Sequence, residues 1–222
     1  MTTTKRDPRI VAIDGPAGAG KSTVGRALAA DLGVGYLDTG AMYRGVTFAV
    51  LQRGIGPNDI EAVGEVARTV DLDIRDVDGA TRLTVDGTDA TADIRGREVT
   101  ANVSAVAANS LVRSELVERQ RRWVAERGGA VVEGRDIGSV VFPDADLKLF
   151  VTASPRLRAE RRVAEIGGDV DQVEASIIER DRKDSSRADS PLVEASGSTV
   201  VDTTGMSIDE VVAHITSMLR PR

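Results

Sequence analysis

One short run near the start of the chain constrains its fold more than any other feature. Residues 10–13 are apolar, residues 15–22 match the pattern G-x-x-x-x-G-K-[ST], and residues 21–32 carry apolar side chains at helical spacing. Glycines allow the backbone to approach an anion closely, and the N–H groups at a helix N-terminus attract negative charge. The run therefore predicts a buried strand, a phosphate-binding loop and a helix. The alternative is a glycine-rich connection that binds no ligand.

This loop predicts how a nucleotide is held. Its backbone N–H groups surround the phosphates, the side chain of Lys21 reaches the terminal phosphate groups, and the hydroxyl of Ser22 binds Mg²⁺. The residues expected to bind the nucleotide are Gly15, Pro16, Ala17, Gly18, Ala19, Gly20, Lys21, Ser22 and Thr23. Kinases, GTPases, motor ATPases and regulatory modules share such a loop, so the reaction has to be inferred from the rest of the chain.

Composition excludes several classes of function. The 222 residues include no cysteine and a single histidine, His214, which excludes disulfides, thiolate metal sites and a histidine-based metal centre. The net charge of −6 disfavours binding to nucleic acid or to an anionic membrane. Residues 1–8 are polar and lack the apolar core of a signal peptide. We expect a soluble, cytoplasmic monomer with no nucleic-acid or membrane partner.

Apolar runs alternate with helical patterns along the chain. This alternation predicts a single α/β domain, and the apolar runs are typical of parallel strands buried on both faces of a doubly wound, five-stranded sheet. One domain also fits a chain of this length. Strands are expected at 10–13, 36–37, 130–132, 147–151 and 199–201, and helices near 21–32, 41–53, 59–69, 99–127, 155–166, 170–184 and 207–219.

One stretch departs from this pattern. Residues 70–75 and 82–87 alternate apolar and polar side chains, and the turn-rich residues 76–79 separate them. Such alternation with glycine turns indicates short antiparallel strands. We therefore expect residues 60–100 to form a small β-containing insert on the sheet.

Polar residues follow the second and third expected strands. Residues 38–44 come after the second strand, and Arg135 and Asp136 lie in a glycine-flanked turn after the third. Because the carboxyl ends of parallel strands face the ligand, both turns are expected beside the phosphate loop. Arg135 can then bind a phosphate oxygen, and Asp136 can accept from an amino group. Alternatively, the first turn only caps a helix and ends in a solvated arginine, while Arg135 and Asp136 pair with each other.

Arginines are concentrated late in the chain, at residues 156–162 and 179–187. The spacing of Arg180 and Asp184 fits an i,i+4 ion pair on a solvated helix face, and spacing alone favours that interpretation. The alternative is a lid over residues 155–187, whose arginines surround the phosphates and exclude water during phosphoryl transfer.

Together these residues resemble the bacterial cytidylate kinases, a family of nucleoside monophosphate kinases. The most specific part is the turn Gly134-Arg135-Asp136-Ile137-Gly138 with the following Val141-Phe142-Pro143-Asp144-Ala145, and further matches lie at 15–22, 38–44, 60–100, 103–113 and 180–192. The resemblance covers nearly the whole chain. It implies a three-layer phosphate-loop kinase fold, with an insert at 60–100 that binds the nucleoside monophosphate and an arginine-rich helical lid at 155–187.

The resemblance also implies a reaction, in which the γ-phosphoryl group of ATP, bound with Mg²⁺, passes to CMP or dCMP. It implies that Ser104, Arg113 and Asp136 contact the cytosine edge, that Arg44, Arg135 and Arg187 hold the acceptor phosphate, and that Arg180 and Asp184 contact the sugar. Thr39 and Tyr43 are further candidates for substrate binding. The catalytic candidates are Lys21, Arg135, Asp136, Arg158, Arg162 and Arg187, with Arg161 as an additional lid arginine.

Three other functions are compatible with the loop. Another small kinase of this kind would act on an acid or on a different nucleotide, and the insert and the Gly134-Arg135-Asp136 turn argue against it. A GTP-dependent switch would need an Asn-Lys-x-Asp segment to read guanine, which the sequence lacks. A regulatory module would bind ATP without turning it over.

Overall fold

The computed structural model describes residues 10–77, 79–186 and 191–219. These residues form two compact units. The first contains the described residues up to Tyr36 together with those from Arg127 onward, and the second is Leu37–Glu126. The prediction of a single domain therefore stays a prediction, and each unit is described by itself below. None of the helices in the described part of the chain is long and apolar enough to cross a membrane.

The first unit is built around a five-stranded sheet. The spatial order is β2-β6-β1-β7-β8, and β6, β1, β7 and β8 run parallel to one another. Val11 of β1 pairs in register with Val131 on one side and Leu147 on the other. The sheet and its strands confirm the predicted α/β class. The strands are β1 (Ile10–Asp14), β2 (Gly35–Asp38), β6 (Ala130–Glu133), β7 (Leu147–Thr152) and β8 (Thr199–Asp202).

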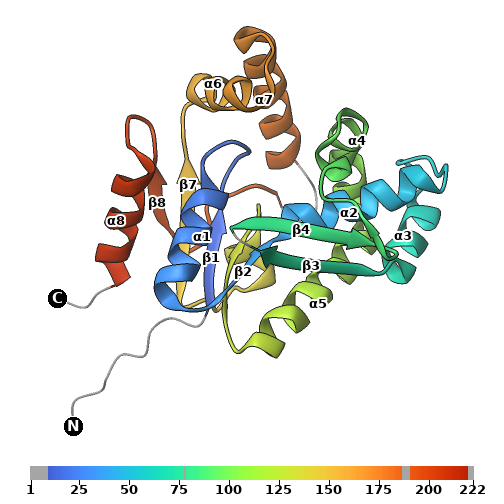
Figure 1. Cartoon of the computed structure of the whole chain (residues 1–222), viewed down its shortest axis with the longest axis horizontal. Helices are drawn as coiled ribbons and strands as arrows, with labels where there is room; N and C mark the ends of the chain where they lie inside the picture. Colours follow the sequence, from blue (N-terminus) through green and yellow to red (C-terminus); the bar gives the residue numbers. More distant parts are fainter. Residues whose placement is uncertain (1–9, 78, 187–190, 220–222) are drawn as a thin grey trace. The chain divides into compact units, whose positions relative to one another are not determined.

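Two helices of the first unit, α1 and α8, pack on this sheet, and two others, α6 and α7, form a helical hairpin (Figure 1). The apolar faces of α1 and α8 pack together, and with Val11, Val131 and Leu149 of the sheet they form one buried core. Helix α1 ends at Gly33, whose positive φ of 65° suits a glycine C-cap. The helices are α1 (Lys21–Leu32), the single π-helical turn η2 (Ile137–Val141), α6 (Pro155–Ile166), α7 (Val170–Ser185) and α8 (Ile208–Leu219).

The second unit combines helices with a small antiparallel sheet, as predicted for its 60–100 segment. Strand β4 pairs with β3 and β5. The sheet packs on α2 at Gly45, where an added Cβ would lie 2.7 Å from Leu83 Cδ2. The elements are α2 (Thr39–Gln52), α3 (Ile60–Thr69), β3 (Leu72–Val77), β4 (Ala80–Val85), β5 (Thr88–Asp89), the 3₁₀ turn η1 (Asp93–Arg95), α4 (Arg97–Ala108) and α5 (Ser110–Arg127).

The prediction of one helix over residues 99–127 is wrong, because the chain breaks at Asn109 into α4 and α5. The Asn109 side chain donates from Nδ2 to the carbonyl of Ile60, 2.8 Å away, and its Oδ1 accepts from the N–H of Leu111 at 3.0 Å. An asparagine that bonds to nearby backbone in this way competes with continued helix. The break thus comes from one side chain and leaves the apolar pattern unchanged.

Candidate active site

The loop between β1 and α1 has the conformation that its glycines predict. Gly15 has a φ of 143°, and a Cβ there would lie 1.9 Å from the carbonyl oxygen of Val151, so no side chain fits. Gly18 and Gly20 have φ values of 76° and 90°, in the left-handed region that favours glycine. These three positions carry no side chain, which favours close approach of an anion to the backbone N–H groups of the loop.

Lys21 and Ser22 begin α1, beside the end of β6. Lys21 is 7% exposed, and its Nζ donates to the carbonyl of Pro16 at 2.8 Å. Ser22 Oγ donates to Glu133 Oε1 at 2.7 Å, and Glu133 is buried. Glu133 is not among the site residues predicted from the sequence, although a carboxylate that ends the strand next to a phosphate loop is a known signal for a metal partner.

This pair of oxygen donors fits Mg²⁺. The hydroxyl of Ser22 and the carboxylate of Glu133 are hard ligands, and Mg²⁺ in phosphate sites takes one or two protein ligands and completes its shell with phosphate oxygens and water. Within the described ranges there is no group of three or more acidic or histidine side chains that could hold a metal alone.

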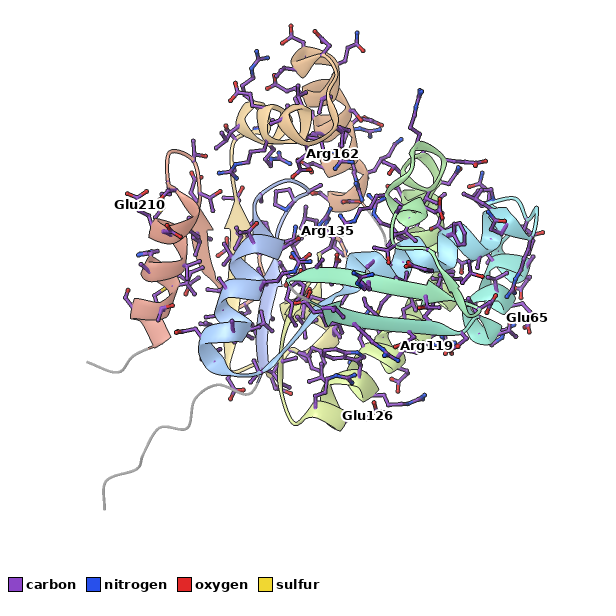
Figure 2. All side chains as sticks on the ribbon, viewed as in Figure 1. Glu65, Arg119, Glu126, Arg135, Arg162 and Glu210 are labelled. Carbon is purple, nitrogen blue, oxygen red and sulfur yellow. The ribbon has the colours of Figure 1, made fainter. Side chains whose placement is uncertain are left out.

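Arg135 connects the loop to α7. Its Nε donates to Asp184 Oδ2 at 2.9 Å, and its Nη1 donates to the carbonyl of Gly15 at 3.0 Å (Arg135 is labelled in Figure 2). Asp184 is 1% exposed, and Arg180 Nε lies 4.0 Å from the same carboxylate oxygen. Asp136, the next residue along the turn, is buried. The structure therefore brings three of the predicted substrate residues, Arg135, Arg180 and Asp184, into one cluster within the first unit.

Two arginines of α6 lie directly against the phosphate loop. Arg158 is buried, pairs with Asp181 at 2.6 Å, and donates to the carbonyl of Ala17 at 3.2 Å. Arg161 Nη1 lies 3.6 Å from the position of a Cβ on Gly20 and donates to Thr203 Oγ1 at 3.3 Å. Their placement supports the lid interpretation for these two residues.

Other charged residues of α6 and α7 behave as a solvated face. Arg162, labelled in Figure 2, pairs with Glu165 at 3.1 Å. Glu179 pairs with Arg182 at 2.8 Å and with Lys183 at 3.5 Å, and the hydrogen bond from Arg182 is the main reason that the pKa of Glu179 falls to about 2. The solvated-face interpretation therefore fits these residues, and the lid stays a prediction. Arg187 lies outside the described residues.

Residues 38–44, the predicted turn after β2, lie in the second unit together with the residues that they contact. Asp38 Oδ1 accepts from the N–H of Ala41 at 3.0 Å and so caps α2, as the alternative interpretation had it, with the predicted Thr39 buried next to it. Arg44 is half-buried and donates to the carbonyl of Ile94 and to Thr100 Oγ1, both at 2.9 Å, so it is not a freely solvated charge.

Two further predicted residues of this unit lie on neighbouring helices. The guanidinium of Arg113, on α5, is buried and lies 5.9 Å from the ring centre of Tyr43. This distance is within the range of a cation–π contact. Ser104 is half-buried on α4. The second unit thus orders Tyr43, Arg44 and Arg113 through contacts of its own.

The phosphate loop, the parallel sheet and the buried carboxylate beside Ser22 define a phosphate-loop nucleotide-binding protein. Solved structures agree on the fold alone. An uncharacterized protein from Eubacterium ventriosum has a TM-score of 0.54 at 12% identity, and a gluconokinase from Sinorhizobium meliloti has a TM-score of 0.51 at 16% identity. The matches cover 96% of this chain and 99% of the first structure, and 97% of this chain and 93% of the second.

Sequence comparison narrows this class to one family. The family model described as cytidylate kinase matches residues 11–221, and the cytidylate kinase of Mycobacterium leprae is 49% identical over 218 residues, 96% of each chain. The chain belongs to the cytidylate kinase family, which confirms the resemblance. It is also 48% identical over 222 residues, 96% of its own length, to the bifunctional pantoate ligase/cytidylate kinase of Trichormus variabilis. The match covers 41% of that relative, so the chain spans about two fifths of it.

Proposed function

We propose that this chain transfers the γ-phosphoryl group of ATP to CMP or dCMP, giving ADP and CDP or dCDP. Family membership and the name of the Mycobacterium leprae relative support the reaction. The observation that carries it most directly is Arg135, which bonds to Gly15 in the phosphate loop and to Asp184 in α7. One guanidinium thereby spans the donor loop and the residues assigned to the acceptor.

ATP would bind at the loop. The backbone N–H groups of residues 15–22 and the Nζ of Lys21 would hold its phosphates, and Lys21 must first leave the carbonyl of Pro16. Ser22 and Glu133 would hold Mg²⁺, which neutralises charge on the phosphates and orients them. Preformed positive charge of this kind stabilises the transition state without reorganisation during the reaction.

The acceptor would be read by residues of each unit. In the first unit, Asp136 would accept from the cytosine amino group, Arg135 and Arg187 would hold the phosphate, and Arg180 and Asp184 would contact the sugar. In the second unit, Ser104 and Arg113 would contact the base, Arg44 would contact the phosphate, and Thr39 and Tyr43 are further candidates for contact with the nucleotide. Carboxylate and hydroxyl oxygens match an amino donor, and a guanidinium matches the carbonyl and ring nitrogen of cytosine.

Catalysis would then be positional and electrostatic. The acceptor phosphate is anionic near neutral pH, so no side-chain nucleophile is required. Arg158 and Arg161 would act with Lys21 on the phosphates, and Arg162 would join them after leaving Glu165. Residues 155–187 would serve as the lid, and residues 60–100 would serve as the insert on the acceptor side of a single kinase domain. We further propose a monomeric, cytoplasmic enzyme.

The test is release of ADP from ATP and Mg²⁺ with five acceptors, namely CMP, dCMP, UMP, AMP and shikimate. Turnover with CMP and dCMP above the others supports the proposal. Tight ATP binding with no turnover would instead indicate a regulatory module, and turnover with AMP or shikimate alone would indicate a different kinase. Asp59→Asn, an exposed cap of α3, is the matched control, since asparagine caps a helix as well as aspartate does.

A further inference from the structure

Asp14 is a buried carboxylate to which neither the loop pattern nor the resemblance gives a role. It ends β1 directly before Gly15 and is 3% exposed. Buried carboxylates need either a cationic partner or several hydrogen bonds, because desolvation of the charge is costly. The contacts of Asp14 therefore indicate which groups its negative charge binds.

Both oxygens of this carboxylate hold the turn that contains Asp136. Oδ1 accepts from the N–H of Ile137 and Oδ2 accepts from the N–H of Gly138, each at 2.7 Å. These are the two residues that directly follow Asp136 in the chain. A side chain on Gly138 would crowd the bond, since its Cβ would lie 3.3 Å from Asp14 Oδ2.

The residues before Asp136 are tied to the same strand end. The N–H of Gly134 donates to the carbonyl of Ile13 at 2.9 Å, and Arg135 donates to the carbonyl of Gly15 at 3.0 Å. Three consecutive residues, Ile13, Asp14 and Gly15, thus bond to the residues that precede and follow Asp136 in the chain. Only the bonds of Asp14 depend on a side chain of that strand.

The charged groups near Asp14 do not offset the free-energy cost of burying its carboxylate. Burial is the largest cause that raises its pKa, to about 6, with Asp136 adding to the rise. The two backbone bonds and the charge of Lys21 lower it. Lys148 of β7 lies beside Gly138, but its Nζ donates to the carbonyl of Ser196 at 3.2 Å. A neutral side chain of the same shape would cost less free energy to bury, so the two amide bonds are the contacts that account for a carboxylate at this position.

We propose that Asp14 is a positioning residue, whose carboxylate clamps the two amides that follow Asp136 and so aligns Asp136 with the acceptor base next to the phosphate loop. The inference rests on the proposed function, because it assigns this turn to the acceptor. An ionised carboxylate can accept both N–H groups, whereas a protonated carboxyl or an asparagine can accept one and presents a donor to the other. Asp14→Asn therefore mimics the protonated residue without a change in volume.

The experiment compares wild type, Asp14→Asn and the control Asp59→Asn with CMP, UMP and ATP. In Asp14→Asn, loss of one buried acceptor raises KM for CMP about ten-fold at pH 7.5 and lowers the CMP/UMP ratio of kcat/KM, while KM for ATP stays unchanged. In the control Asp59→Asn, all of these constants stay at their wild-type values. Equal increases in both KM values, or an unchanged CMP/UMP ratio, would overturn the role of Asp14. If wild type does not use CMP at all, the proposed function fails instead.

A pH profile separates this role from a merely structural one. The acceptor phosphate has its own second pKa near 6, which acts on every variant alike. Between pH 7.5 and 5, kcat/KM of wild type for CMP falls about ten-fold further than that of Asp14→Asn, and the two converge at low pH. Parallel profiles would overturn the proposal. Should the variant not fold, a wild-type profile that follows only the single proton of the phosphate overturns it as well.

Discussion

Replacement of Asp14 by asparagine should stabilise the protein at neutral pH while it impairs the acceptor site. The pKa of Asp14 rises from the ordinary 3.8 to about 6 in the folded chain, mainly through burial. A carboxyl with a raised folded pKa stabilises fully below its unfolded pKa, and the contribution is lost as pH rises through the folded value. A rise of about two units corresponds to about 3 kcal/mol, which wild type loses between pH 4 and 7 and the variant does not.

Urea unfolding at pH 4.5 and pH 7.5 measures this difference. Relative to wild type, the free energy of unfolding of Asp14→Asn should rise by about 2 kcal/mol from pH 4.5 to pH 7.5, because wild type loses about 1 kcal/mol by pH 4.5 and about 3 kcal/mol by pH 7.5. Circular dichroism follows the whole chain, and the single tryptophan, Trp123, reports on the second unit separately. Carboxylates with lowered pKa, such as Asp86 and Glu179, contribute equally to both proteins. A variant that is equally destabilised at both pH values would refute the reasoning.

Three further changes test other parts of the molecule. Lys21→Ala should lower kcat about 10²- to 10³-fold with an unchanged circular dichroism spectrum, because the lysine acts on charge that grows in the transition state; near-normal turnover would remove the loop from the mechanism. Hydrogen exchange in residues 155–185 should slow when CMP and a non-hydrolysable ATP analogue bind together, and an unchanged pattern would favour a purely solvated face. Leu83→Ala should lower the free energy of unfolding by about 2–5 kcal/mol, since Leu83 is 1% exposed and packs on α2 at Gly45; a change below 1 kcal/mol would contradict that packing.

Local signals predicted the fold well. The apolar run at 10–13 and the glycine pattern after it specify β1, the loop and the start of α1 without any distant contact. The alternating residues at 70–75 and 82–87 likewise specify β3 and β4, which pair in register from Leu72 with Val85 to Val77 with Ala80. Periodicity failed at Asn109, because the helix break depends on a bond to Ile60, far away in the sequence.

The candidate site could be predicted only in part. Motifs identified Arg135 and Asp184, but their bond joins residues 49 positions apart and is set by the packing of α7. Glu133 and Asp14 end apolar strands, where a single carboxylate does not change the strand pattern, so their roles became visible only through Ser22 and Gly138. Contacts of this kind form only at the folded sheet edge, and the local sequence signal for them is limited to the position of a carboxylate at the end of an apolar strand.

The ratio of kcat/KM for CMP and UMP tests the central claim most directly. Uracil would place a carbonyl against the carboxylate of Asp136, acceptor against acceptor, which costs about 1–3 kcal/mol in a buried site. Wild type should therefore prefer CMP by about 5- to 150-fold, and Asp136→Asn, which can donate to that carbonyl, should bring the ratio toward one. Equal kcat/KM for CMP and UMP in the wild-type enzyme would contradict the account.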